Sequence, residues 1–100
     1  MPMYYMDDLF HLVHSDGADG LKLSVGQPPV IVLDGEYQPI EGPLITTEVA
    51  EQLLRSITDT RQRRELRERG AVEFIYRFRG RASFVVCAKI QEENVSMDIH

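Results

Sequence analysis

Histidine, cysteine and carboxylate side chains are those best suited to catalysis or metal binding, and this sequence groups few of them. His11 and His14 stand three residues apart, with Asp7 and Asp8 one helical turn earlier. On a helix, these four side chains could hold a metal ion. No later residues supply further ligands at a recognisable spacing, so we interpret the four as polar residues of a surface helix and expect no metal site.

The remaining reactive residues form no catalytic group. The third histidine, His100, stands at the end of the chain, away from any serine that it could activate. Cys87 alternates with small and apolar neighbours, which favours an inert, buried thiol. No Gly-x-x-x-x-Gly-Lys-Ser/Thr loop is present to hold nucleotide phosphates. We therefore predict no catalytic residues, no cofactor and no enzyme activity for this chain.

Arginine is the residue that the sequence concentrates. Between residues 55 and 81, nine arginines face only four acidic residues, a local balance of +5 in a chain whose net charge is -5. Such an asymmetry can orient a protein on a partner of opposite charge, although a solvated helix face is the alternative interpretation. The candidate interaction residues are Arg61, Arg63, Arg64, Arg67, Arg77, Arg79 and Arg81. We expect the combined reversal of Arg63, Arg64 and Arg67 to glutamate to leave the fold intact and to abolish association with a partner, because only Leu66 and the ends of that helix are expected to be buried.

Length and composition predict one globular domain over residues 1–100, with 43% hydrophobic and 27% charged residues. No apolar run approaches the ~20 residues that span a bilayer, and no secretory signal opens the chain. The single cysteine fits a reducing compartment, so we expect a cytoplasmic location. The acidic total and the lack of interleaved aromatic and basic residues disfavour nucleic-acid binding.

Hydrophobic periodicity predicts a mixed order of helices and strands. The stretch LKLSVGQPPVIVLDG, residues 21–35, reads as a β-hairpin with a stiff Pro28-Pro29 connection, and Asp34-Gly35 then turns the chain into a further strand at 36–40. Helices are expected over residues 3–14, from Thr46 or Thr47 to Ile57, and from Thr58 to Gly70. The buried stripe of the second helix should consist of Val49, Ala50, Leu53, Leu54 and Ile57. Closing strands are expected at 71–78, 81–90 and 95–99, with the last at a sheet edge. The first of them alternates, with one face formed by Val72, Phe74, Tyr76 and Phe78 and the other by Glu73, Ile75 and Arg77. These elements predict an α/β (α+β) fold, a mixed and mainly antiparallel sheet of five or six strands with helices on one face.

The hairpin and the helix before it resemble a known family. The sequence DGLKLSVGQPPVIVLDGE is similar to the N-terminal domain of PilT-type pilus retraction ATPases and their GspE-type secretion relatives. In that family, a strand reading roughly Ser-Asp-Leu-His-Leu-Ser precedes Gly-x-Pro-Pro, an apolar run with an arginine, and Asp-Gly. The matching residues here are Asp19, Leu21, Leu23, Ser24, Gly26, Pro28, Pro29, Asp34 and Gly35. The resemblance extends over the whole chain, stops where the family's ATPase domain would begin, and implies a PAS-like fold.

Several charged positions of the family pattern are changed. Lys22 stands in place of the histidine and Val32 in place of the arginine. A later family segment reads like Gly-x-Ala-Arg-Phe-Arg-Val-Asn, and its arginines can face a neighbouring subunit's nucleotide. Aligned through Gly80, Ala82, Phe84, Val86 and Gln91, this chain has Ser83 and Val85 at those two arginines. The resemblance therefore implies a scaffold that has lost its part in ATP sensing.

Our leading hypothesis is a non-catalytic interaction or regulatory domain associated with a type IV pilus (twitching motility) or type II secretion motor. Its partner would be a motor subunit or a second copy of the chain, through a sheet edge or helix face. One alternative is a PAS-like sensor of a small ligand, which needs an apolar cavity between sheet and helices. Another is that the chain is the N-terminal fragment of a full retraction ATPase.

Overall fold

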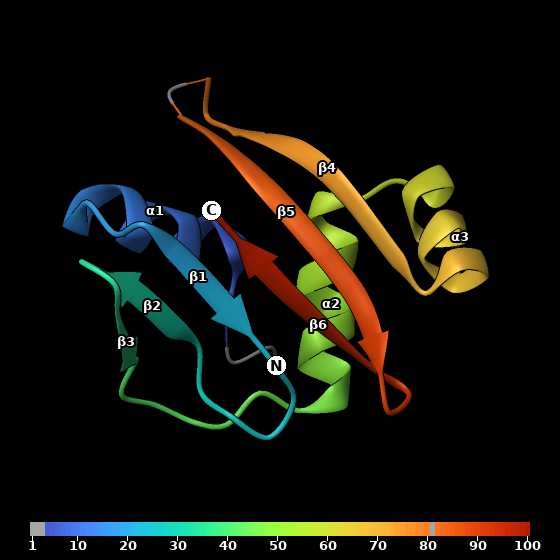
Figure 1. Cartoon of the computed structure of the whole chain (residues 1–100), viewed down its shortest axis with the longest axis horizontal. Helices are drawn as coiled ribbons and strands as arrows, with labels where there is room; N and C mark the ends of the chain where they lie inside the picture. Colours follow the sequence, from blue (N-terminus) through green and yellow to red (C-terminus); the bar gives the residue numbers. More distant parts are fainter. Residues whose placement is uncertain (1–3, 81) are drawn as a thin grey trace.

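The computed structural model of the chain describes residues 4–80 and 82–100, so Arg81 lies outside the described residues. Three helices pack against a six-stranded antiparallel sheet, two of them over one face and the third beside the start of an edge strand (Figure 1). The helices are α1 (Met6–Asp16), α2 (Thr47–Ile57) and α3 (Thr60–Arg69). The strands are β1 (Gly20–Leu23), β2 (Val30–Leu33), β3 (Glu36–Pro39), β4 (Ala71–Phe78), β5 (Ala82–Gln91) and β6 (Asn94–Ile99). The predicted fold class is confirmed, with six strands and every described strand pair antiparallel.

The strand order, β3-β2-β1-β6-β5-β4, places the last strand in the middle of the sheet. β6 pairs with β5 on one side and with β1 on the other, so that Leu21 faces Ile99 and Val86 faces Ile99. The prediction that residues 95–99 form a sheet edge was therefore wrong. The physical reason is that the chain forms two three-stranded units, β1–β2–β3 and β4–β5–β6, which become one sheet through the pairing of β6 with β1. The edges of the sheet are β3 and β4 (Figure 1).

Turn residues fix the hairpin registers. Asp34 and Gly35 have φ values of 51° and 80°, as a tight two-residue turn between β2 and β3 requires. The turn between β5 and β6 is also left-handed at both positions, but they are occupied by Glu92 and Glu93, with φ values of 51° and 70°. Neither glutamate favours that conformation, so the surrounding ladder, in which Gln91 faces Asn94, holds this turn.

The connection between β1 and β2 is fastened to a distant segment. The carbonyl of Pro29 accepts the Ile40 N–H at 2.8 Å, and the side chain of Pro29 is fully buried. Gly26 and Gln27 exchange backbone hydrogen bonds with Ile45, each at 2.8 Å. The stiff loop predicted from the sequence is thus a packed part of the structure, tied to the segment that leads into α2.

Capping residues define the helix boundaries. The Thr46 hydroxyl accepts the Val49 N–H at 3.2 Å and caps α2, whose stripe of Val49, Ala50, Leu53, Leu54 and Ile57 is buried as predicted. The predicted start of the third helix was wrong: Thr58 ends α2, and Asp59 caps α3 in a reciprocal pair with Gln62. The predicted end at Gly70, in the left-handed conformation, is confirmed. α1 begins at Met6 and continues to Asp16, past the predicted end at residue 14, and residues 1–3 lie outside the described part.

The core lies between the helices and one face of the sheet. Its centre is Phe10 of α1, which has no exposed surface and whose ring centroid is 5.1 Å from that of Tyr76 and 4.8 Å from that of Phe84. The predicted alternation of β4 is confirmed, since Val72 and Phe78 face this core while Ile75 on the other face is 70% exposed. The sheet face opposite the helices is therefore left uncovered by the described residues.

Candidate interaction surface

The basic helix α3 is attached to the domain through few contacts. Leu66 is its one buried residue, and its arginines at 61, 64, 67 and 69 are exposed. Gly70 then turns the chain directly into β4. Most of the arginine-rich segment of the sequence thus projects from one helix beside the end of the sheet (Figure 1).

Arg63 differs from the other arginines of α3. It is half-buried, and its Nη1 donates to the backbone carbonyl of Thr58 at 2.7 Å and to the Thr58 hydroxyl at 3.0 Å. These two bonds satisfy groups at the end of α2 and fix α3 against it. Arg63 is therefore a structural residue of the α2–α3 corner rather than a free surface charge.

A groove of about 250 Å³ lies between α2, α3 and the β5–β6 hairpin, and we call it the α2–α3 groove. Its apolar residues are Leu54, Leu66, Ile90 and Val95, of which Ile90 remains 39% exposed. Its charged residues are Glu51, Arg55, Arg63, Arg67 and Glu93. Two predicted interaction residues, Arg63 and Arg67, thus meet Arg55 from a second helix. Arg55 could not be singled out from the sequence, because only the packing of the two helices brings it to α3.

The structure does not join Arg77 and Arg79 to this groove. Arg77 faces Ser83 on the uncovered sheet face, and Arg79 lies in the turn at the far end of β4 from α3. The Arg79 guanidinium lies over the Phe78 ring, 5.0 Å from its centroid, and 3.7 Å from the Asp7 carboxylate. Arg81 lies outside the described residues. The positive segment is consequently divided between the two ends of β4.

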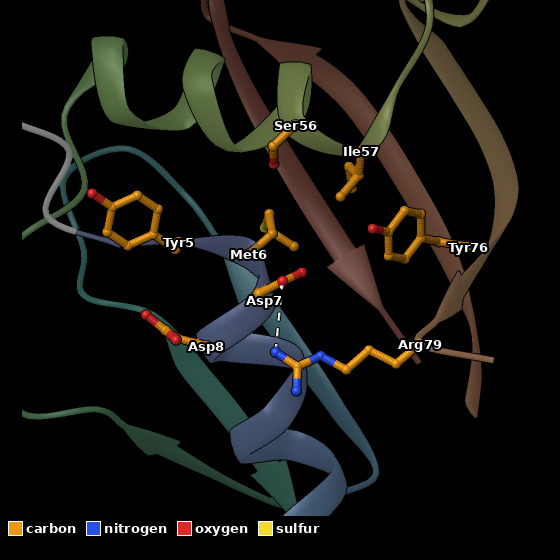
Figure 2. Close-up of a pocket in the computed structure, with 8 residues that line it drawn as sticks. All are labelled: Tyr5, Met6, Asp7, Asp8, Ser56, Ile57, Tyr76 and Arg79. Atoms are coloured by element: carbon orange, nitrogen blue, oxygen red, sulfur yellow. Dashed lines mark ion pairs between the residues drawn. The ribbon is translucent and has the colours of Figure 1, made fainter. Parts of the chain in front are cut away.

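A second pocket, of about 460 Å³, lies where the start of α1, the end of α2 and β4 meet (Figure 2). Tyr5, Met6, Asp7, Asp8, Ser56, Ile57, Tyr76 and Arg79 line it. Asp7 and Arg79 are each 60% exposed, so their ion pair contributes little to stability. Two carboxylates against one guanidinium give the pocket a negative balance, which disfavours a phosphate group. It offers no activated nucleophile, and no group of three or more metal-ligating side chains occurs among the described residues.

The uncovered sheet face carries two polar contacts between neighbouring strands, one between β1 and β6 and one between β5 and β4. Lys22 Nζ donates to Asp98 at 2.6 Å, and this hydrogen bond raises the pKa of Lys22 against the opposing effect of partial burial. Cys87 donates its thiol to the Glu73 carboxylate at 3.1 Å. This hydrogen bond, followed by partial burial, raises the pKa of Cys87 above its ordinary value. The prediction that Cys87 is buried was wrong, because its side chain is only half-buried and lies on this uncovered face.

No protein-family model matches the chain, and no curated protein sequence matches it. Solved structures do. The crystal structure of the pilus retraction motor PilT with bound ADP superimposes with a TM-score of 0.88 and 24% sequence identity over 97% of this chain. The ATPase DotB of Legionella pneumophila superimposes with a TM-score of 0.79 and 19% identity over 95% of this chain. The fold is that of the N-terminal region of these ATPases.

The resemblance deduced from the hairpin is thereby confirmed at the level of the fold. The chain covers only 29% of the length of the PilT chain and 27% of the DotB chain. Their activities as whole proteins belong to chains more than three times as long.

Proposed function

We propose that this chain is a non-catalytic interaction domain that works with the motor ATPase of a type IV pilus or related secretion machine. The observation that carries the proposal is the α2–α3 groove, in which three arginines, Arg55, Arg63 and Arg67, exceed the two glutamates that line the same apolar floor. The similarity of the chain's fold to parts of PilT and DotB supports the proposal that its partner is a motor ATPase of this kind. We infer a cytoplasmic site of action, because such motors consume ATP. None of the described helices has the length and apolar character to cross a membrane.

The groove fits an acidic segment that also carries apolar side chains. Ile90 and the neighbouring apolar groups would bury an aliphatic or aromatic residue, and arginine is the residue best suited to bind a carboxylate in two places. Arg63 is already held by Thr58, so Arg55 and Arg67 are the arginines free to meet the partner. The partner we propose is therefore an acidic, partly apolar segment of the motor ATPase.

The ATPase activity would reside in that motor and not in this domain. The sequence has no phosphate-binding loop, and the larger described pocket is lined by Asp7 and Asp8. If the chain is the front part of a longer retraction ATPase, the acidic segment would belong to the same polypeptide or to a neighbouring subunit. The groove would then join the two domains of the motor.

The small-ligand sensor is less well supported. That hypothesis needs an apolar cavity between sheet and helices, and Phe10 with its stacked neighbours Tyr76 and Phe84 fills the centre of that space. The pockets at the α2–α3 groove and at the start of α1 lie at the borders of the layers. They are better placed for a partner's side chains than for an enclosed ligand.

A pair of matched double reversals tests the groove. Arg55→Glu with Arg67→Glu removes its two free arginines, whereas Arg61→Glu with Arg64→Glu makes the same charge change at exposed positions that do not line it. Binding to the purified motor ATPase would be measured by titration at low and high salt. We expect the groove variant to bind at least about tenfold more weakly, which corresponds to about 1.4 kcal/mol. The control should keep most of the affinity.

The salt dependence distinguishes the groove from general attraction. Because exposed charges are screened beyond about 10 Å at 0.1 M salt, a purely long-range attraction would be lost equally in both variants. Equal weakening of the two variants would reduce α3 to a solvated charged helix. Unchanged binding in both would place the contact elsewhere on the domain.

A further inference from the structure

The edge strand β4 has a charge pattern that is complementary to itself. On the uncovered sheet face, Glu73 and Arg77 stand two residues before and two residues after Ile75. Ile75 is 70% exposed, an unusual degree for a branched aliphatic side chain in a strand. If two β4 strands ran antiparallel with Ile75 opposite Ile75, each Glu73 would face an Arg77 of the other copy.

The backbone of β4 is oriented to make such a pair. Val85 of β5 exchanges both of its backbone hydrogen bonds with His100, at 2.7 and 3.0 Å, so its N–H and C=O point away from β4. Val85 is the residue that faces Ile75. In an antiparallel ladder, residues whose groups point apart alternate with residues that bond each other. The N–H and C=O of Ile75, and those of Glu73 and Arg77, therefore point outward from the sheet edge.

We propose that this chain forms a two-fold symmetric dimer through β4, paired in this register to make one continuous twelve-stranded sheet. Each facing pair formed by Glu73, Ile75 and Arg77 would exchange two backbone hydrogen bonds, which gives about six in all. On the helix-covered face, Phe74 would lie opposite Tyr76 of the other copy, and aromatic cross-strand pairs are favourable. α3 lies beside the start of β4, so the paired stretch begins where this helix flanks the strand (Figure 1).

Other registers are less favourable on this strand. In a register shifted by one residue, the outward-pointing N–H and C=O groups of one copy would face residues of the other copy whose N–H and C=O groups point back toward β5. The side chains of the two copies would also lie on opposite faces of the sheet. A shift by two would separate Glu73 from Arg77. Among the described residues no strand pairs with the outer side of β4. Exposed strand edges otherwise invite pairing without specificity, and opposite charges on either side of Ile75 would select one geometry.

Cysteine substitutions test the register directly, in a Cys87→Ser background that removes the native thiol. Two Ile75→Cys residues would lie about 5.5 Å apart between Cα atoms, within the range of a disulfide, so mild oxidation should give a covalent dimer. Glu73→Cys alone and Arg77→Cys alone should stay monomeric, because the two thiols would lie about four residues apart along the strands, or about 14 Å. An equal mixture of these two variants should again cross-link.

Charge exchange on the otherwise unchanged chain gives an independent measurement. Sedimentation at high concentration should show dimerisation weakened by Glu73→Arg alone and by Arg77→Glu alone, since each places like charges opposite each other. The double variant Glu73→Arg with Arg77→Glu should restore it. Cross-linking of all three single-cysteine variants to the same extent, or a double variant no better than the single ones, would overturn the proposed register. Since the groove residues are not altered, this surface can fail while the function proposed for the α2–α3 groove stands.

Discussion

The guanidinium of Arg63 in α3 donates two hydrogen bonds to Thr58, the residue at which α2 ends. One bond goes to the backbone carbonyl and the other to the hydroxyl, which itself donates to the Leu54 carbonyl at 2.7 Å. A side chain that reads as part of a charged surface in the sequence thus closes the C-terminal end of the neighbouring helix. The corner that it fixes also forms the α2–α3 groove.

Replacement of Arg63 by alanine should destabilise the domain. Loss of hydrogen bonds from a charged donor costs about 1.5–3 kcal/mol each when the partner is left unpaired, and water can reach part of this site, so we expect about 1–3 kcal/mol in total. Arg64→Ala, one position further and exposed, is the matched control and should change the free energy of unfolding by less than about 0.5 kcal/mol. Urea denaturation followed by circular dichroism measures both. The protein with the combined reversal of Arg63, Arg64 and Arg67, which the sequence led us to expect to leave the fold intact, should unfold more easily for the same reason.

The Pro28-Pro29 connection should contribute to stability and not to binding. Replacing both prolines by glycine should cost on the order of 1–2 kcal/mol, because each compatible proline restricts the unfolded chain by about 0.4–1 kcal/mol. The structure adds that Pro29 should account for the larger share, since its ring is fully buried. Denaturant midpoints of Pro28→Gly, Pro29→Gly and the double variant decide this. Equal effects of the two single variants would mean that burial of the Pro29 ring contributes nothing.

The sequence predicted the elements whose signals are local. The alternation in β4 placed its core-facing residues correctly, and the Asp34-Gly35 and Gly70 stops fell where a left-handed backbone is needed. α2 was recognised because a threonine cap preceded a complete apolar stripe. These features depend on neighbouring residues only, so one sequence is enough to read them.

Features that depend on pairing between distant segments could not be read in this way. Nothing in residues 95–99 indicates that the strand joins both hairpins and lies inside the sheet. The arginines formed one group along the chain, but eight residues of extended β4 separate α3 from Arg79. Likewise, the role of Arg63 required the position of Thr58 after α2 had formed. The self-complementary pattern around Ile75 acquires a meaning only once β4 is known to be an edge.

The isolated chain should neither bind nor hydrolyse ATP. The sequence lacks a phosphate-binding loop, and triphosphate binding requires cationic groups and a magnesium site that the Asp7 and Asp8 pocket does not provide. Titration calorimetry of the purified chain with ATP and magnesium should give no heat of binding at micromolar protein. A magnesium-dependent affinity in the micromolar range would contradict the assignment of all nucleotide chemistry to another domain.

The thiol of Cys87 should react slowly, although it is half-exposed. Its hydrogen bond to Glu73 and its partial burial raise its pKa, so less of the nucleophilic thiolate is present at neutral pH than in a free cysteine. Glu73→Gln should lower that pKa and speed alkylation at pH 7–8, whereas Glu65→Gln, on α3, should not.

The raised pKa of Cys87 also fixes the direction of a stability change. The folded state prefers the protonated thiol, so this contribution is complete below the unfolded pKa of about 8.5 and is lost as the pH rises through the higher folded value. Alkylation rates measured from pH 6 to 10 should therefore give a midpoint at a higher pH for the folded chain than for an unfolded control. If the two rate profiles coincide, Glu73 does not raise the pKa of the thiol.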